Sequence, residues 1–277
     1  MGHSESMTAD DATRAKGAEL LRLHQKQTLL TVVNVWDVVS AKTVAAVDGT
    51  KALATASHSI AASFGYPDGE NIPLDLMLDM VGRIVAATEL PVSADLERGY
   101  GDAGETIRRA IGVGAVGANL EDAMAPFDEA VTAVRAAVRA AHAEGVPFAL
   151  NARTDVFLRS APPAGGGSSA EEATVGQKIE EAIRRGRAFL DEGATCVFLP
   201  GKLDEHTIER LVEGLGERTL SVIAVPGSVP PARLHELGVA RVSYGPWTQR
   251  VALTALRHAA QNLYAGGVLP DGTLLLN

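Results

Sequence analysis

The sequence predicts an α/β protein in which a single (β/α)8 TIM-type barrel domain takes up residues 1–277. Eight short, apolar or β-branched runs alternate with helical patterns along the chain, and strands separated by helices pair in parallel. Eight such units within about 250 residues match a closed barrel better than an open, doubly wound sheet. No glycine-rich turn of the dinucleotide-binding kind follows the first strand, which weakens the Rossmann alternative.

Composition narrows the class of protein further. Hydrophobic residues make up 46% of the chain and aromatic residues only 4%, which suits Ala/Val/Leu/Ile strands that are covered on both faces. The net charge of −9 argues against nucleic acid or an anionic membrane as partner, and leaves a small anionic substrate possible. Cys196 is the only cysteine, so an intramolecular disulfide and a cysteine-rich zinc site are excluded. No apolar run has the length of a membrane span and no signal peptide is evident, so we expect a cytoplasmic protein.

The predicted elements follow one another in one alternating order. A polar leader over residues 1–10, expected to be disordered, overlaps the start of a helical pattern over 9–27. The expected strands cover residues 29–37, 51–57, 91–97, 118–122, 147–155, 195–201, 220–226 and 240–245. The helices between and after them cover residues 38–47, 72–88, 103–113, 128–144, 178–192, 207–215, 231–237 and 251–264. Residues 162–169, with three glycines and two prolines, predict a flexible loop rather than a linker, because the same alternation resumes after them.

Acidic side chains gather at the predicted ends of consecutive strands. Side chains alternate along a strand, so Asp95 and Glu97 are expected on one face. Barrel active sites lie at the carboxyl ends of the strands, where the next two strands contribute Glu121 and Arg153. Oxygen ligands of this kind suit Mg²⁺, with Mn²⁺ as a second possibility, better than zinc. The alternatives are a pair of solvated loop acids or a structural ring of salt bridges.

A guanidinium beside a divalent cation would hold a substrate with two anionic ends, because arginine grips a carboxylate while the metal polarises an oxygen. Three other side chains are candidates for a chemical role. His58, in the loop after the second strand, could donate a proton. Lys202 follows the sixth strand, where a Schiff-base lysine could lie, although a solvated charge explains it more simply. Cys196, inside that strand, is interpreted as a small buried residue.

Six motifs give the chain a family resemblance over about residues 29–260. They are Asn34-Val35-Trp36-Asp37, Ser63-Phe64-Gly65-Tyr66-Pro67-Asp68, Ser93-Ala94-Asp95-Leu96-Glu97-Arg98-Gly99-Tyr100-Gly101, Asn119-Leu120-Glu121-Asp122, Asn151-Ala152-Arg153-Thr154-Asp155 and Val197-Phe198-Leu199-Pro200-Gly201. In this set and order, the motifs resemble those of the isocitrate lyase/phosphoenolpyruvate mutase family.

The resemblance implies a barrel whose last helix is exchanged between paired subunits, in a homo-oligomer that is a dimer or a homotetramer. It implies Mg²⁺ held, partly through water, by Asp95, Glu97 and Glu121, with Asp68 reaching in from the second loop. Members of the family make or break C–C or P–C bonds through the enolate of a 2-oxo acid. The residues expected to contact the substrate are Trp36, Asp37, Thr55, Ala56, Ser57, Asn119 and Arg153, and the expected catalytic residues are Arg153, Asp68 and His58.

The chain departs from the family pattern after the fourth strand. Family lyases that cleave isocitrate or methylisocitrate carry a Lys-Lys-Cys-Gly-His segment there, whose cysteine is the general acid. Here Glu121-Asp122 is followed by Ala123-Met124-Ala125-Pro126-Phe127 and then directly by a helix. The asparagine that phosphoenolpyruvate mutases use in this loop is missing as well.

The retained acids and the short loop predict a Mg²⁺-dependent lyase or decarboxylase that acts on a small 2-oxo or 2-hydroxy dicarboxylate, such as oxaloacetate, through an enolate intermediate. Decarboxylation suits such a site because CO₂ leaves without receiving a proton. One alternative is a P–C bond enzyme of the phosphoenolpyruvate mutase or phosphonopyruvate hydrolase type. Another is a non-catalytic protein that binds a metabolite in the same pocket.

Overall fold

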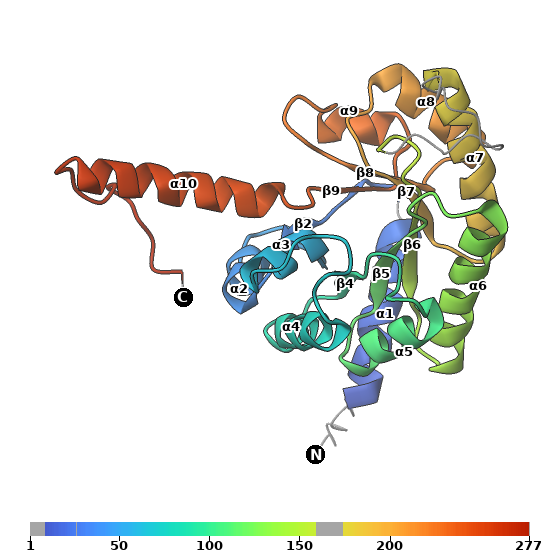
Figure 1. Ribbon diagram of the computed structural model, residues 1–277, viewed down its shortest axis with the longest axis horizontal. Coiled ribbons are helices and arrows are strands. Elements are labelled where there is room, and N and C mark those ends of the chain that lie inside the picture. Colours follow the sequence, from blue (N-terminus) through green and yellow to red (C-terminus); the bar gives the residue numbers. More distant parts are fainter. Residues whose placement is uncertain (1–8, 26, 159–173, 277) are drawn as a thin grey trace, which may run out of the picture.

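The computed structural model describes residues 9–25, 27–158 and 174–276 (Figure 1). Residues 1–8 of the predicted leader and the predicted loop 162–169 therefore lie outside the described residues. Residues 9 and 10 belong to the first helix, α1 (Ala9–Gln25), so the helix replaces the last two residues of the expected leader.

A parallel ring of strands forms the centre of the molecule and confirms the predicted barrel. In the described residues its strands are β1 (Leu30–Thr31), β2 (Val33–Val35), β3 (Leu53–Thr55), β4 (Val92–Asp95), β5 (Gly117–Glu121), β6 (Ala149–Arg153), β7 (Cys196–Leu199), β8 (Leu220–Ile223) and β9 (Arg241–Ser243). β1 and β2 are two parts of one predicted strand, separated by Val32, whose N–H donates to the Val242 carbonyl at 3.0 Å. β1 pairs with β9 and β2 pairs with β3, so this split strand completes a nearly closed barrel.

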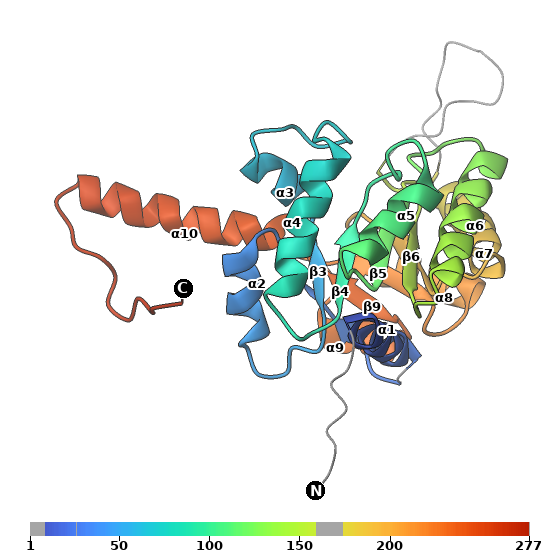
Figure 2. The same cartoon turned by 90° about the horizontal axis from the view of Figure 1, so that it is seen from below.

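Most helices lie outside the ring, as Figures 1 and 2 show. They are α2 (Val38–Ala45), α3 (Ser57–Ser63), α4 (Leu74–Ala86), α5 (Ala103–Gly112), α6 (Phe127–Ala143), α7 (Val175–Asp191), α8 (Glu205–Leu215), α9 (Pro231–Glu236) and α10 (Trp247–Tyr264). The helix α3 occupies a stretch that the sequence predicts as a loop of small residues. Its Ile60 and Ala61 are fully buried, so tertiary packing outweighs the weak local helix signal there.

The helix α1 closes the amino-terminal end of the barrel. Leu20 is fully buried against the start of β5, where a Cβ on Gly117 would lie 2.8 Å from its side chain. His24, on the same helix, is only 4% exposed. Its Nδ1 lies 2.8 Å from the Leu20 carbonyl oxygen, and burial together with the charge of Arg241 lowers its pKa to about 4. His24 is therefore part of the face of the helix that covers the barrel end, and it does not face water.

One interior layer of the barrel is polar. Cys196 is buried, as the sequence predicts; its thiol donates to Asn151 Oδ1 at 3.0 Å, and burial raises its pKa to about 12. Arg241 is fully buried, and its Nη1 lies 3.3 Å from Ser93 Oγ. Barrel interiors are usually filled by branched apolar side chains, so this layer gives the overlying site a polar floor.

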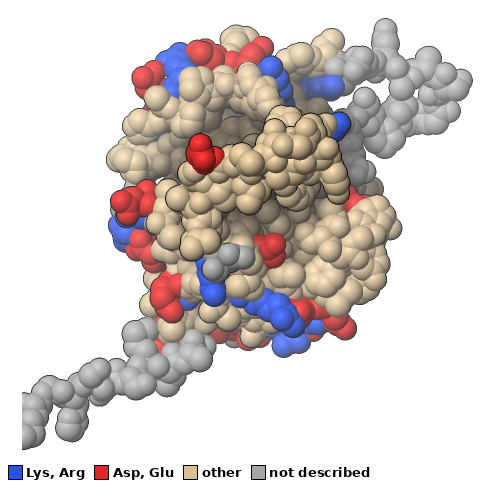
Figure 3. Space-filling view, turned by 90° about the vertical axis from the view of Figure 1, so that its left-hand side faces the viewer, with Lys and Arg blue, Asp and Glu red and all other residues tan. Residues whose placement is uncertain are grey.

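The last helix, α10, projects away from the barrel in both ribbon views (Figures 1 and 2). It exposes large apolar side chains, with Val251, Leu253 and Leu256 between 55% and 69% exposed. Figure 3 looks onto this end of the molecule, where most of the surface around the helix carries neither acid nor base. None of the described helices combines the length and the hydrophobicity that a membrane crossing requires.

Candidate active site

A cavity of about 370 Å³ lies at the carboxyl ends of the strands. It brings together seven residues that the sequence predicts for the site, namely Ala56, Ser57, His58, Asp68, Asp95, Asn119 and Arg153. Sequence reasoning missed several further lining residues, among them Asn34, Phe198, Ser243, Trp247 and Arg250. Asn34 and Phe198 belong to two of the six motifs; Ser243, Trp247 and Arg250 carry no local signal and are placed by the fold.

Asp95 is the most firmly positioned acid of the cavity. Its Oδ2 accepts hydrogen bonds from the backbone N–H and the hydroxyl of Ser57, at 3.0 and 2.8 Å. Its own N–H donates to Thr55 Oγ1 at 2.9 Å, so Thr55 supports Asp95 from below and does not itself line the cavity. Asp95 Oδ1 is buried without a hydrogen-bond partner among the described residues. One carboxylate oxygen is thus fixed and the other is available to a ligand.

Glu97 lies just beyond the end of β4, where the alternation of a strand no longer applies. Its φ of +50° turns the chain, and its side chain is nevertheless only 4% exposed. One of its oxygens accepts the backbone N–H of Glu70, and Oε1 has no hydrogen-bond partner in the described part of the chain. Burial, and then the charges of Asp95 and Asp68, raise the pKa of Glu97 to about 8. The neighbouring carboxylates therefore disfavour the ionised form of Glu97.

Glu70, which the sequence reasoning did not single out, ties two loops together. Its carboxylate accepts the backbone N–H groups of Arg98 and Tyr100, at 3.1 and 2.7 Å. These contacts hold the loop that carries Asp68 against the loop that follows β4. The signal in the sequence is an acid two residues after Asp68, just beyond the end of the motif Ser63–Asp68.

Arg153, at the end of β6, is paired with two carboxylates. Its Nη1 lies 2.8 Å from Glu121 Oε2 and its Nε lies 2.7 Å from Asp155 Oδ1. Burial lowers the pKa of Arg153, but Glu121 and Asp155 outweigh this effect and raise it above the ordinary value. The guanidinium is permanently charged, and the Glu121 carboxylate contacts it directly.

The residues fit a metal ion only in part. Within the described residues, no group of three or more His, Cys, Asp or Glu side chains is arranged to hold a metal. Glu121, an expected ligand, faces Arg153 instead. Asp95 and Glu97 nevertheless offer two buried carboxylate oxygens without hydrogen-bond partners, in surroundings that favour added positive charge. Mg²⁺ usually keeps several waters and needs only one or two carboxylates, so these two acids fit a hydrated Mg²⁺ ion.

His58 and Asp68 form a pair inside the same cavity, with 3.4 Å between His58 Nδ1 and Asp68 Oδ2. Both side chains are partly exposed, at 41% and 52%, so water reaches them. A histidine beside a carboxylate can hold or release a proton next to a bound ligand.

Trp36 and Asp37 are not among the residues that line the cavity, so the geometry gives no support to their expected contact with a substrate. Asp37 caps α2, because its Oδ1 accepts the Ser40 N–H at 2.7 Å, and Ser40 completes the capping box. Trp36 packs against the hydrophobic core.

The short loop after β5 is a fixed turn. Ala123 and Met124 both have positive φ, at 44° and 60°. Asp122 accepts the N–H groups of Met124 and Asp155, at 3.0 and 3.1 Å, and pairs with the buried Arg185 at 2.9 Å. The place where family lyases carry their acidic cysteine is thus occupied by a short turn, which Asp122 and Arg185 hold in place.

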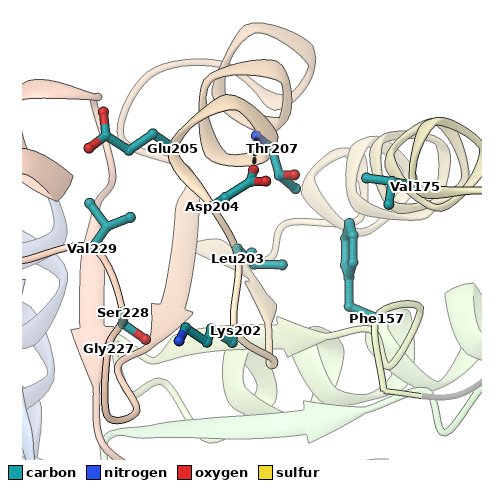
Figure 4. A pocket seen from close by; sticks show the side chains of 10 residues that line it. All are labelled: Phe157, Val175, Lys202, Leu203, Asp204, Glu205, Thr207, Gly227, Ser228 and Val229. Carbon is teal, nitrogen blue, oxygen red and sulfur yellow. Dashed lines mark hydrogen bonds between the residues drawn. The ribbon is translucent and has the colours of Figure 1, made fainter.

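Lys202 lies in a neighbouring cavity of about 500 Å³, shown in Figure 4. In that view its side chain extends toward the loop of Gly227 and Ser228, with Phe157 and Leu203 on the other wall. Lys202 does not line the cavity of Asp95 and Arg153, so the structure gives no support to a Schiff-base role there.

A parallel barrel with acids and an arginine at the carboxyl ends of its strands defines an enzyme-type (β/α)8 protein. Residues 20–264 match the family described as phosphoenolpyruvate phosphomutase. The chain belongs to this family, within the isocitrate lyase/phosphoenolpyruvate mutase superfamily.

Individual relatives agree with this assignment. An uncharacterized protein of Mycobacterium tuberculosis is 30% identical over 252 residues, which cover 90% of each chain. The oxaloacetate decarboxylase of Paraburkholderia xenovorans is 27% identical over 263 residues, covering 89% of this chain and 82% of that protein. A crystal structure of a candidate phosphonomutase from Burkholderia cenocepacia has 37% identity and a TM-score of 0.79, and covers 92% of this chain and 100% of its own. The superfamily thus contains decarboxylases, lyases and mutases.

Proposed function

We propose that the protein is a Mg²⁺-dependent lyase of the decarboxylase type, which acts on a small 2-oxo or 2-hydroxy dicarboxylate through an enolate. Oxaloacetate is the reference substrate. The observation that carries the proposal is the cavity lined by Asp95 and Arg153, in which Asp95 Oδ1 has no hydrogen-bond partner among the described residues and the Glu97 carboxylate lies close to Asp95. The similarity to a bacterial oxaloacetate decarboxylase supports the choice of substrate.

Each side chain has a distinct part in this proposal. A bound Mg²⁺ would supply Lewis-acid polarisation of the 2-oxo oxygen. Asp95, fixed by Ser57, and Glu97 would hold the ion. Arg153 would bind the carboxylate next to the 2-oxo group, because a guanidinium can donate two parallel hydrogen bonds to it. Asn119, on β5, faces the same cavity and would orient the substrate by hydrogen bonding.

The His58–Asp68 pair would handle the proton that decarboxylation requires afterwards. CO₂ leaves without a proton, and the carbon that it leaves behind must then be protonated. His58 lines the cavity, and its Nδ1 lies 3.4 Å from Asp68 Oδ2. This pair would replace the cysteine acid that other family members carry in the loop after the fourth strand.

The direct test compares oxaloacetate consumption by protein with Mg²⁺ against Mg²⁺ alone, with pyruvate measured as product. We expect turnover above the metal-ion rate, and loss of turnover in Asp95→Asn. Asp79→Asn, an exposed acid on α4, is the matched control and should behave as wild type. If neither oxaloacetate nor any 2-oxo or 2-hydroxy dicarboxylate in a panel is consumed above the metal rate, the proposal fails. Formation of oxalate and acetate would instead reveal hydrolytic C–C cleavage.

A second candidate is P–C bond chemistry, which the family description and the candidate phosphonomutase favour. Phosphorus NMR of the protein with phosphoenolpyruvate and with phosphonopyruvate would reveal it, and unchanged spectra would remove it. Binding of oxalate with Mg²⁺ in isothermal titration, without product from any candidate substrate, would indicate a metabolite-binding protein instead.

A further inference from the structure

A row of buried polar side chains crosses three neighbouring strands at the floor of the candidate active site. Asn119 on β5 is the register partner of Asn151 on β6, which is in turn the register partner of Cys196 on β7. All three are buried, and only Asn119 lines the cavity. Branched apolar side chains would fill the centre of a barrel without the cost of burying polar groups. Packing alone therefore does not account for this row.

Hydrogen bonds join the three residues into a relay with one direction. The Cys196 thiol donates to Asn151 Oδ1 at 3.0 Å, and Asn151 Nδ2 donates to Asn119 Oδ1 at 2.7 Å. The oxygen of the Asn119 amide is thus already engaged by Asn151. Nothing in the described part of the chain accepts a hydrogen bond from Asn119 Nδ2. Its N–H groups are therefore the half of the amide that is left for a ligand in the cavity.

Arg241 supplies a buried positive charge at the start of this relay. Its side chain extends across the barrel interior from β9 to β4, where Nη1 lies 3.3 Å from Ser93 Oγ. The charge acts on the Cys196 thiol, because it opposes the burial that raises the pKa of that thiol to about 12. A cation attracts the sulfur and repels the thiol hydrogen, which favours the S–H that points to Asn151. Hydrogen bonds in a chain polarise one another, so the charge strengthens the Asn119 N–H as a donor.

We propose that Asn151 and Cys196 are positioning residues, which hold the Asn119 amide with its N–H toward the cavity as a donor to an anionic oxygen of the ligand. This inference rests on the proposed function, in which negative charge develops on a substrate oxygen as the enolate forms. A fixed N–H stabilises that charge more than it stabilises the neutral ketone, so the relay acts mainly on kcat. Asp95, the register partner of Asn119 on β4, places the fixed acid of the cavity beside this donor.

Two replacements of Cys196 separate positioning from packing. Cys196→Ser keeps a donor to Asn151, whereas Cys196→Val has no donor and fills the space with apolar groups. We expect kcat with oxaloacetate to fall about fivefold in Cys196→Val at nearly constant KM, as for one lost hydrogen bond, and to fall less in Cys196→Ser. Ser221→Ala is the matched control, because it removes a buried hydroxyl without a partner among the described residues, and it should keep both constants. Equal losses in both Cys196 variants, or losses that only follow the melting temperature, would overturn the inference.

Isothermal titration of oxalate in the presence of Mg²⁺ separates the relay from the proposed reaction. Oxalate already carries negative oxygens, so its affinity measures the Asn119 donor whether or not the protein turns over any substrate. Asn119→Leu should lose about tenfold in affinity, as for a hydrogen bond to a charged group, and Cys196→Val about fivefold. Cys196→Ala, which also lacks a donor, takes the place of the valine variant if that protein does not fold.

The titration has outcomes that count against each proposal separately. Unchanged affinity in Asn119→Leu, equal affinities in the serine and valine variants of Cys196, or no binding of oxalate to wild type would each refute the relay. The expected losses of affinity in a protein without turnover would refute only the decarboxylase.

Discussion

Among single residues, Glu97 is a buried carboxylate whose ionised form is disfavoured by its surroundings. Its side chain is buried beside Asp95 and Asp68, and one of its oxygens lacks a hydrogen-bond partner among the described residues. A buried carboxylate in such surroundings is easier to keep protonated than ionised. A divalent cation would reverse that preference, because it attracts the ionised form.

The raised pKa predicts a specific pH dependence of stability. The metal-free folded protein retains the Glu97 proton up to about pH 8, whereas the unfolded chain releases it near 4.5. Between these values the folded state binds more protons, so the contribution of Glu97 to stability falls as the pH rises. Relative to wild type, Glu97→Gln should therefore gain melting temperature between about pH 5 and 8, and match it near pH 4.5.

Differential scanning fluorimetry with a chelator provides the measurement. The difference in melting temperature between variant and wild type separates the effect of Glu97 from that of His24. The low pKa of His24, about 4, makes its contribution to stability rise with pH, opposite to that of Glu97. Parallel pH profiles of the two proteins would contradict the prediction. With Mg²⁺ at pH 8, wild type should gain more melting temperature than Glu97→Gln, because only wild type provides the charged ligand.

The proton-donating role of His58 also belongs to the residue scale. His58→Gln keeps a hydrogen-bonding side chain of similar reach but cannot release a proton. We expect kcat for the decarboxylated substrate to fall about 100-fold with a small change in KM, the range typical of a lost general acid. His206→Gln, an exposed histidine on α8, is the control. A variant with wild-type kcat would assign the protonation to water.

Single elements show what local sequence predicts and what it cannot. The strand ending at Asp95 and the acids near it could be predicted because alternation and burial are local properties. The turn at Glu97 could not, since its positive φ ends the alternation and is held by Glu70 from another loop. The helix α3 was missed because its small residues are helical only when packed. Arg250 carries no local pattern at all, and only the closing of the barrel brings it to the cavity.

The anchored turn after β5 depends on one buried ion pair. Arg185, on α7, is 5% exposed and reaches Asp122, which in turn holds the backbone of Met124 and Asp155. The charges of Arg185 and Asp122 compensate one another, and removal of one leaves the other buried without its partner. The turn that replaces the gating loop should therefore be sensitive to this pair.

We expect Arg185→Met to lower the free energy of unfolding by about 3 kcal/mol, as for a broken buried pair. Arg83→Met removes an exposed partner of Asp79 on α4 and should cost less than about 1 kcal/mol. Arg184 is a poorer control, because it stacks on Phe127 at 3.9 Å. Urea unfolding of the three proteins gives the comparison, and similar losses for both variants would show that the Asp122 pair does not anchor the turn.

For the whole molecule, the barrel could be predicted from the sequence, and so could the location of the candidate site at the carboxyl ends of its strands. Topology explains this success, because parallel strands joined through helices bring their carboxyl ends to one side. The pairing of Arg153 with Glu121 could not be predicted in the same way. The register Glu121↔Arg153 between β5 and β6 decides it, and only the assembled sheet sets that register.

Among the described residues, the projecting helix α10 is a large feature that its own chain leaves mostly uncovered. Leu256 is 65% exposed and Val251 is 69% exposed, on a helix that contacts its own barrel mainly near its start. Contiguous apolar surface of this kind indicates an interface. A second copy of the chain fits the family resemblance, in which the last helix is exchanged between subunits.

Leu256→Glu should therefore disrupt self-association, because a buried carboxylate without a partner costs more than the leucine contributes, about 1.5–3 kcal/mol. Light scattering after size exclusion should give wild type a multiple of 28.9 kDa and the variant the mass of one chain. Val175→Glu, a 60% exposed valine at the start of α7 and far from α10, is the control and should keep the wild-type mass. A monomeric wild type, or an unchanged mass in Leu256→Glu, would mean that α10 does not hold subunits together.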